Sequence, residues 1–262
     1  MIMNEVLAFA NNHPWLTALF CSVGGYLIGT VSSARIVYFL ATGKRNIEPF
    51  AEPVPNSDEV FESDLVSATL VNKKLGAKYG CITSVADMLK IALPMLLVRL
   101  AFDEQPYHLL VALFGVAGHN FPVWYGFKGG RGESSIIGSL LVTSWSGYLI
   151  ANLASVVLGF ITGSVLVMRW GAYFLMPVWL WFQFRDWRYV AFMVLLVLLF
   201  LLSMRKDLAR FNELKRKRGS KFTEEEVSEF ILMGKSPGRM LDRYSLYSLI
   251  RRVFSKGREA RK

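Results

Sequence analysis

The segment Trp187-Arg-Tyr-Val-Ala-Phe-Met-Val-Leu-Leu-Val-Leu-Leu-Phe-Leu-Leu-Ser203 contains a single charged residue among almost only apolar ones. A run of this composition is typical of a transmembrane helix. Other segments of the chain have the same character, so the sequence predicts an all-α membrane protein with about seven transmembrane helices. The six further segments lie at residues 15–40, 82–102, 107–124, 134–145, 148–168 and 170–184.

The composition agrees with this fold class. Of 262 residues, 53% are hydrophobic and 19% are charged, whereas about 25% of a soluble protein is charged. Trp and Tyr lie at many segment ends, as expected for residues that anchor helices at the membrane interface. Segments 134–145 and 148–168 are short and long respectively, and we expect a helix pair that turns at Ser146-Gly147.

Several function classes are disfavoured by particular residues. The two cysteines, Cys21 and Cys81, form no CxxC pair, so neither a disulfide framework nor a zinc site is expected. The N-terminal region reaches its first charge at Glu5 and has no basic stretch, so a cleaved signal peptide is not expected. No cofactor or metal is required by any pattern in the chain.

The positive charge is concentrated in the last 58 residues. The net charge is +10, and residues 205–262 contain 17 Lys and Arg against 8 Asp and Glu. We therefore predict a transmembrane domain over residues 1–204 and a basic, partly helical tail over residues 205–262. The positive-inside rule places this tail in the cytoplasm, and an odd number of helices then places the N-terminus outside. The tail suits contact with anionic membrane lipids, whereas nucleic acid is not expected because no binding motif is present.

Two regions outside the apolar segments have recognisable patterns. Residues 43–80 form the largest loop, which we expect to be irregular in its proline-containing first half and helical for a turn or two within Ser63 to Leu75. In the tail, Thr223-x-x-Glu226 is a capping box that predicts a helix start. From Arg239, a helix is predicted because apolar residues recur at helical spacing among basic ones: Met240, Tyr244, Tyr247, Ile250 and Phe254. This pattern fits a helix on the membrane surface and equally a solvated helix that packs on its own domain.

The clearest local motif runs from Gly118-His-Asn-Phe-Pro122 to Phe127-Lys-Gly-Gly-Arg-Gly-Glu-Ser-Ser135. Pro122 interrupts a helix, and the following glycines let backbone N–H groups converge on a ligand. Lys128 and Arg131 are cationic donors suited to phosphate, and Ser134 opens a helix whose N-terminus favours an anion. These features predict a phosphate cradle at the cytoplasmic face. A tight turn with two cations reaching toward water is the alternative.

Other catalytic patterns are absent from the sequence. There is no GxxxxGK[ST] loop and no GxSxG elbow. His119 lacks the Asp of an HxxxxD dyad, and a metal site of three histidines is implausible because His13 and His108 lie on the predicted outer side. Asp87 and Lys90 lie three residues apart on one helix face. We expect them to form an ion pair within the membrane, since an unpaired charge there costs several kcal/mol.

The glycine-rich stretch Gly118–Gly132 closely resembles the second motif of the bacterial membrane-embedded glycerol-3-phosphate acyltransferases that use acyl phosphate as donor. That family's pattern is G-H-x-F-P-V-x-x-x-F-K-G-G-K-G, and only Arg131 departs from it. Asp87 to Lys90 with Leu93-Pro94 resembles the family's D-x-x-K-G-x-L-P, with Ile91 in place of the glycine. The resemblance covers about residues 20 to 210.

Two further motifs of this family are altered. The first, G-S-G-N-x-G-A-T-N-x-x-R-x-x-G, aligns with residues 62–76, where Lys73 stands in place of the Arg. Its matching residues are Ser63, Ala68, Thr69 and Gly76, and its departures are Asp64, Leu65, Ser67 and Leu70. The third motif supplies a His and an Asn in the family. Here residues 203–214 contain no His, although Asn212 and Glu213 are present.

The resemblance implies that the hydroxyl of glycerol-3-phosphate attacks the carbonyl of an acyl phosphate, which gives lysophosphatidic acid for phospholipid biosynthesis in the cell membrane. It implies that Ser63 orients a reacting group as the catalytic residue. The implied substrate-binding residues are Thr69, Lys73, His119, Asn120, Lys128, Gly129, Gly130, Arg131 and Gly132. Two alternatives stay open: a member that has lost catalysis and binds lipid phosphate or a partner protein, and a small transporter, which lacks support because no inverted repeat is evident.

Overall fold

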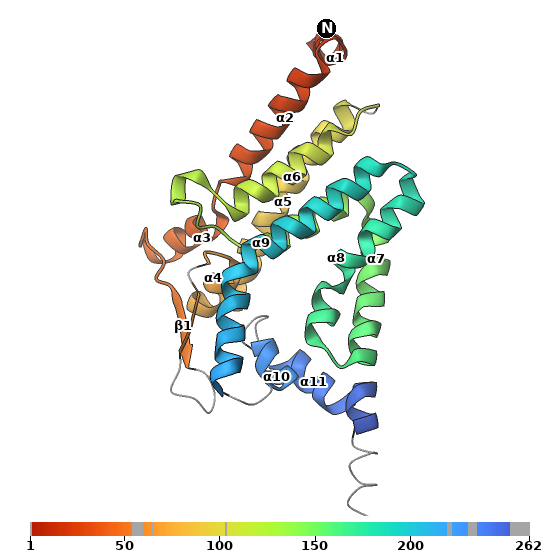
Figure 1. Ribbon diagram of the computed structural model, residues 1–262. Coiled ribbons are helices and arrows are strands. Elements are labelled where there is room, and N and C mark those ends of the chain that lie inside the picture. Colours follow the sequence, from red (N-terminus) through yellow and green to blue (C-terminus); the bar gives the residue numbers. More distant parts are fainter. Residues whose placement is uncertain are drawn as a thin grey trace, which may run out of the picture. The chain divides into compact units, whose positions relative to one another are not determined.

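The computed structural model describes residues 2–53, 60–63, 65–102, 104–218, 222–229 and 235–251. Within these residues the chain is nearly all helical (Figure 1). The elements are α1 (Ile2–Asn12), α2 (Pro14–Gly29), α3 (Ser33–Thr42), β1 (Phe50–Pro53), β2 (Val60–Ser63), α4 (Ala68–Leu75), α5 (Ala77–Ala101), α6 (Tyr107–Asn120), the 3₁₀ turn η1 (Val123–Tyr125), α7 (Glu133–Thr162), α8 (Val165–Phe184), α9 (Trp187–Arg218), α10 (Glu224–Val227) and α11 (Ser236–Tyr244).

The predicted class, an all-α membrane protein, is confirmed. In the described part of the chain, five helical stretches are long and apolar enough to cross a membrane. The predicted number of about seven is not confirmed by this criterion and stays a prediction. The stretches are Pro14–Thr42, Ala77–Ala101, Glu133–Thr162, Val165–Phe184 and Trp187–Lys217.

The expected helix pair within residues 134–168 is present with shifted boundaries. Helix α7 has non-helical backbone at Ser144 (φ −158°, ψ 80°), two residues before the predicted turn, and it ends at Thr162 instead of residue 168. The guanidinium of Arg99 on α5 donates to the carbonyl oxygens of Val142 and Thr143, directly before the break. Backbone carbonyls at membrane depth need such a partner, so Arg99 stabilises the break.

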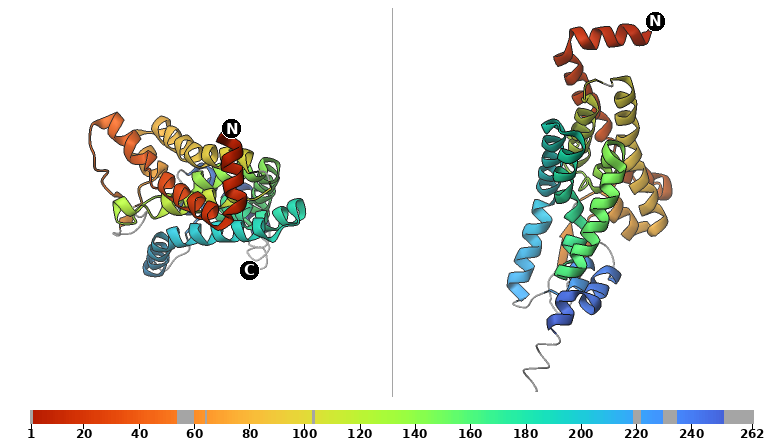
Figure 2. Two further views of the ribbon diagram at one scale, coloured as in Figure 1. Left: turned by 90° about the horizontal axis from the view of Figure 1, so that it is seen from above. Right: turned by 90° about the vertical axis from the view of Figure 1, so that its right-hand side faces the viewer.

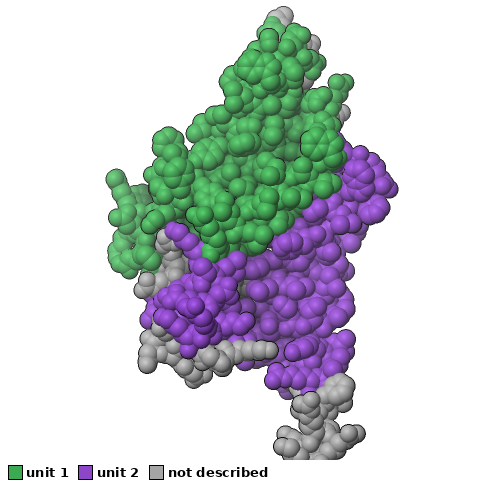
Figure 3. Space-filling model, viewed as in Figure 1, with its two compact units in different colours: residues 1–50, 62–145, 187–205 green, residues 51–61, 146–186, 206–262 purple. Residues whose placement is uncertain are grey.

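The chain divides into two compact units, which Figure 3 shows in separate colours. Unit 1 comprises residues 1–50, 62–145 and 187–205, and unit 2 comprises residues 51–61, 146–186 and 206–262. All the predicted site residues belong to unit 1. Helix α9 is continuous through the predicted domain boundary after residue 204, and that boundary stays a prediction.

Within unit 1, helices α2 and α6 lie side by side (Figure 1). Glycines make this close approach possible, because a Cβ on Gly25 or Gly29 would collide with the α6 backbone, and a Cβ on Gly118 would collide with the α2 backbone. Small residues at such positions are the usual basis of tight helix packing in membranes. The hydroxyl of Tyr26 also donates to the carbonyl of Phe121, at 2.8 Å. The contact therefore fixes the end of α6, where the glycine-rich loop begins.

The N-terminal helix α1 is separated from α2 at His13, whose backbone is non-helical (φ −132°, ψ 60°). Figure 2 shows α1 turned away from the direction of α2. The loop predicted as irregular contains the short strands β1 and β2, which form a two-stranded sheet. The predicted helical turns before Leu75 are confirmed as α4.

Unit 2 contains the described part of the basic tail. The predicted capping box is confirmed: Thr223 Oγ1 accepts from the N–H of Glu226, and the Glu226 carboxylate accepts from the N–H of Thr223. The carboxylate of Glu224 accepts from the N–H of Val165 at 2.7 Å, so it caps the start of α8. Burial raises the pKa of this carboxyl, and the nearby Asp242 carboxylate raises it further, whereas the bond from Val165 opposes the shift.

The prediction of a continuous tail helix from Arg239 is wrong in one respect. Helix α11 ends at Tyr244, and the extended backbone of Ser245 (φ −65°, ψ 148°) separates it from helical residues 246–251. The buried Ser245 hydroxyl accepts from the N–H of Ser248 at 3.2 Å, so it begins a new helix as a cap. Helical periodicity alone does not reveal such a break. Phe254, also part of the expected helix, lies outside the described residues.

Replacing Gly29 by Val tests the packing of α2 on α6. The added side chain meets the backbone of Gly115, so we expect a loss of about 1–3 kcal/mol, the usual cost of overpacking. The measurement is thermal unfolding of the purified protein in detergent. Gly24→Ala is the matched control, because no atom lies within 4 Å of its Cβ position, and it should unfold no earlier than the unmodified protein. Equal midpoints for both variants would contradict the packing argument.

Candidate functional site

The glycine-rich loop folds back on the C-terminal end of α6. The N–H of Gly130 donates to the carbonyl of His119 at 3.1 Å. Between these residues the chain turns through left-handed backbone at Gly126 (φ 60°) and Phe127 (φ 62°). Gly126 adopts this conformation without strain, whereas for Phe127 it is uncommon. The loop therefore returns to the residues that precede it.

At three positions of the loop only glycine fits, because neighbouring atoms leave no room for a Cβ. A Cβ on Gly129 would collide with the carbonyl oxygen of His119, and one on Gly130 would collide with the imidazole ring of the same residue. A Cβ on Gly132 would collide with the side-chain amide of Asn120, and the backbone of Gly132 is left-handed (φ 80°). The structure therefore gathers the predicted residues His119, Asn120, Gly129, Gly130 and Gly132.

A small cavity of about 10 Å³ lies against this loop, about the room that one water molecule needs. It is bounded by the break between α2 and α3 on one side and by His119, Gly129 and Gly130 on the other. The N–H of Val66 donates to the carbonyl of Gly129 at 3.1 Å, which ties the segment before α4 to the loop. The remaining lining residues are Gly29, Thr30, Val31, Ser32, Ser33, Ala34 and Pro122.

A buried charge cluster joins three elements beside the cavity. The ammonium of Lys90 lies 2.8 Å from Asp87 Oδ1, 2.7 Å from the carbonyl oxygen of Val31 and 2.9 Å from His119 Nδ1. Asp87 Oδ1 lies 3.4 Å from the same imidazole nitrogen. The predicted ion pair of Asp87 and Lys90 is confirmed. It also holds an imidazole and the backbone between α2 and α3, which the sequence did not indicate.

The other residues of the second motif differ in exposure. Lys128 is exposed to solvent, whereas Arg131 is 8% exposed. The carbonyl of Arg131 accepts from the buried hydroxyl of Ser203 at 3.2 Å. The amide of Asn120 donates to the carbonyl of Leu199 at 3.3 Å. Two contacts to α9 thus fix the loop, and both involve backbone carbonyls that no sequence motif identifies.

The first-motif residues belong to unit 1, and Val66 connects their segment to the glycine-rich loop. Thr69 and Lys73 are half-buried on α4, which begins two residues after Val66. Ser63 ends strand β2, and its side chain lies outside the described part of the structure. The role expected of Ser63 therefore stays a prediction.

In the segment of the third motif, one carboxylate forms two ion pairs, and no histidine is present. On α9, Glu213 lies 3.1 Å from Arg210 and 3.2 Å from Lys217.

Among the described residues, no group of three or more His, Cys, Asp or Glu is placed to hold a metal ion.

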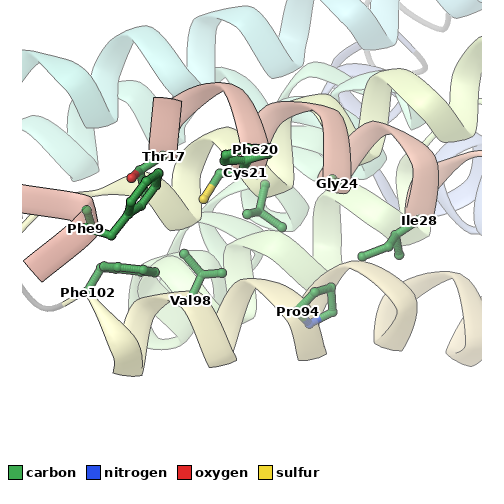
Figure 4. A pocket seen from close by; sticks show the side chains of 12 residues that line it. Phe9, Thr17, Phe20, Cys21, Gly24, Ile28, Pro94, Val98 and Phe102 are labelled. Carbon is green, nitrogen blue, oxygen red and sulfur yellow. The ribbon is translucent and has the colours of Figure 1, made fainter. Parts of the chain in front are cut away.

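A second cavity, of about 330 Å³, lies along α2 between α5 and α6 (Figure 4). Phe20 and Ile28 of α2 line it together with Val98 of α5 and Phe102, the residue after α5. No charged side chain contributes to this lining. The cavity suits hydrocarbon and offers nothing to bind a phosphate, so the candidate headgroup site is the glycine-rich loop.

Comparison with known proteins gives consistent matches. The profile of the family described as glycerol-3-phosphate acyltransferase matches residues 55–213. A glycerol-3-phosphate acyltransferase of Lactiplantibacillus plantarum is 30% identical over 62% of this chain and 73% of its own length. One of Legionella pneumophila (strain Corby) is 35% identical over 47% of this chain, which spans only 40% of that relative.

Two solved structures share the fold. PlsY, an integral membrane glycerol 3-phosphate acyltransferase, in its glycerol 3-phosphate form matches with a TM-score of 0.59 and 26% identity, over 80% of this chain and 98% of that one. Its lysophosphatidic acid form matches with a TM-score of 0.58 and 24% identity, over 75% and 92% of the two chains.

A double-mutant cycle tests the contact between Gly130 and the imidazole. Gly130→Ala places a methyl group against a ring that Lys90 and Asp87 hold in place, so we expect a loss of about 1–3 kcal/mol. In a His119→Ala background the obstructing ring is gone, and the same substitution should cost much less. Thermal unfolding of the four proteins measures this coupling. Equal costs in both backgrounds would show that the ring does not occupy this position.

Proposed function

We propose, because this chain belongs to the glycerol-3-phosphate acyltransferase family, that it transfers an acyl group from acyl phosphate to glycerol-3-phosphate. The attacking hydroxyl oxygen forms an ester bond to the acyl carbon as the bond from that carbon to the phosphate oxygen breaks. The hydroxyl proton is lost, inorganic phosphate leaves, and lysophosphatidic acid is the product. The observation that carries this proposal is the glycine-rich loop folded around His119 beside a small polar cavity.

Each candidate residue has a role that its chemistry supports. Gly129, Gly130 and Gly132 would let the backbone of the loop come close to a phosphate, although the N–H of Gly130 itself donates to the carbonyl of His119. Asn120 supplies a buried amide whose Oδ1 has no hydrogen-bond partner among the described residues. The cations that would hold substrate phosphate are Lys73, Lys128 and Arg131, with Thr69 as a hydroxyl donor. His119 would bind the same anion, and Ser63 would orient a reacting group.

The alternative is a member of the family that has lost catalysis and binds lipid phosphate or a partner protein. One observation favours it: Glu213, in the segment where the family has its third motif, is engaged with Arg210 and Lys217, and no His is present there. A loop that can bind phosphate, in a chain that lacks the third motif, is better explained by a binding protein than by an active enzyme.

The membrane orientation follows from charge. The chain is an integral membrane protein, and we place it in the cell membrane with the N-terminus outside and the C-terminus in the cytoplasm, because the tail is strongly basic. Glycerol-3-phosphate would then reach the glycine-rich loop from the cytoplasm, as phospholipid biosynthesis requires.

Release of inorganic phosphate from purified protein supplied with acyl phosphate and glycerol-3-phosphate tests the activity. We expect release above that of a heat-inactivated control, and a loss of at least about tenfold in Arg131→Ala, because hydrogen bonds to charged groups are worth about 1.5–3 kcal/mol. Arg131→Lys, the residue of the family pattern, is the matched variant and should retain most activity. No release by the unmodified protein, together with thermal stabilisation by glycerol-3-phosphate, would favour the binding alternative.

The tail is proposed to contact anionic lipid. Its described end presents Tyr244, Leu246 and Tyr247, which are 50–58% exposed, together with the exposed Arg243 and Arg251. Ser245 and Tyr247 pack against Gly163, in the turn between α7 and α8. Since α7 and α8 are both candidate spans, this turn lies at a membrane surface. Aromatic and basic residues together at that depth are typical of interfacial helices.

A fluorophore on the tail measures this contact. With Cys21→Ser and Cys81→Ser as background, Leu246→Cys is labelled and the protein is placed in nanodiscs that contain a lipid quencher. We expect strong quenching that increases with the fraction of anionic lipid, because the label lies among headgroups. Ser236→Cys, also exposed, is the control and should be quenched less. Equal quenching at both positions, unchanged by lipid charge, would refute the contact.

A further inference from the structure

The contact between Lys90 and His119 determines which imidazole nitrogen carries the proton. Lys90 Nζ lies 2.9 Å from His119 Nδ1. An ammonium has three donors and no acceptor, so Nδ1 accepts this hydrogen bond with its lone pair. A proton on Nδ1 would face the nearer ammonium, because the only other group at this nitrogen among the described residues, Asp87 Oδ1, is farther away at 3.4 Å. The neutral imidazole therefore carries its proton on Nε2.

Three contacts hold the Lys90 ammonium in place. It forms an ion pair with Asp87 Oδ1 at 2.8 Å and hydrogen bonds with the carbonyl of Val31 at 2.7 Å and His119 Nδ1 at 2.9 Å. The side chains of Lys90 and Asp87 are only 10% and 3% exposed, so water has little access to their ion pair.

The opposite edge of the imidazole faces the glycine-rich loop. The atom closest to a Cβ built on Gly130 is His119 Nε2, and His119 lines the small cavity with Gly129 and Gly130. In the part of the chain that the structure describes, no hydrogen-bond acceptor for Nε2 is found. The N–H at this edge is thus a donor beside the backbone amides of the loop.

We infer that Asp87 and Lys90 are positioning residues that fix His119 as the Nε2–H tautomer, so that it donates a hydrogen bond to an anionic oxygen bound at the loop. The identity of that anion as glycerol-3-phosphate rests on the proposed function, but the tautomer does not. With Nε2 protonated and Nδ1 engaged by an ammonium, His119 offers no lone pair to accept the proton of an attacking hydroxyl. It binds and orients, and it is not a general base.

The tautomer is measured directly by ¹⁵N NMR of histidine-labelled protein in detergent. The chain has only three histidines, and the signal absent from His119→Gln identifies the ring in question. We expect ring shifts of a single Nε2–H tautomer for the unmodified protein. Lys90→Met removes the ammonium and should give a mixture of tautomers, whereas Lys90→Arg retains a donor and should preserve the single form.

The NMR result for the unmodified protein needs no variant to fold, so the inference is testable in every case. An Nδ1–H tautomer or a doubly protonated ring in the unmodified protein would overturn it. The same single tautomer in folded Lys90→Met would also overturn the role of Lys90.

Binding of glycerol-3-phosphate supplies the second readout. We expect at least about tenfold weaker binding in Lys90→Met. Without the ammonium, His119 no longer holds its Nε2–H toward the anion, and this hydrogen bond to a charged group is lost. His119→Gln can place an amide N–H near the position of Nε2 and should bind more tightly than His119→Asn, whose amide is one carbon shorter. Equal affinity of both His119 variants would contradict the donor role. Absence of binding by the unmodified protein would refute the proposed substrate instead and leave the tautomer result standing.

Discussion

A single buried ammonium connects the elements on which the candidate site depends. Lys90 extends from α5 and binds the backbone between α2 and α3 through Val31, a carboxylate one turn away at Asp87, and the imidazole at the end of α6. A charge in a membrane-spanning segment is costly unless it is paired and fully hydrogen-bonded. Because the charge of Lys90 is paired with Asp87 and two further acceptors bind the ammonium, the cluster is tolerated in an apolar helix. The contacts to Val31 and His119 also join α5 to the break after α2 and to the end of α6.

The glycines explain how these elements come close enough for such bonds. Lipid provides little driving force to press apolar helices together, so tight contacts in a membrane need small residues. Gly25 and Gly29 let α2 approach α6, and this brings the break after α2 to the loop that follows α6. Gly129 and Gly130 then let that loop approach His119. The helix packing and the loop therefore rely on the same property, the absence of a Cβ, at successive levels of the fold.

Local patterns in the sequence predicted local features well. The capping box at Thr223, the ion pair of Asp87 and Lys90, and the helical turns of α4 follow from spacing within a few residues, and all three are present. The break in α7 was expected within two residues of its place, since Ser and Gly interrupt an apolar run there.

Features that depend on distant residues were not predictable in this way. The carbonyls of Val31 and Arg131 are backbone groups without any sequence signature, and their partners Lys90 and Ser203 lie 59 and 72 residues away. Ser245 divides the expected tail helix because its buried hydroxyl caps the next helical segment, which periodicity cannot reveal. The first motif could be aligned by residue type, but no pattern indicated that Val66, outside the matching residues, joins it to the loop.

The two cations of the glycine-rich loop are suited to different tasks because their surroundings differ. Lys128 is exposed, so salt at physiological strength screens its charge beyond about 8 Å, and it suits the attraction of an anion from solution. Arg131 is almost fully buried, where a charge acts in a less polar medium, and its planar guanidinium suits bidentate binding of phosphate. His119 adds a neutral donor whose direction is fixed by Lys90. An anion that enters this loop would thus pass from a screened charge to less screened donors, and a preference of the loop for phosphate would come from the buried set.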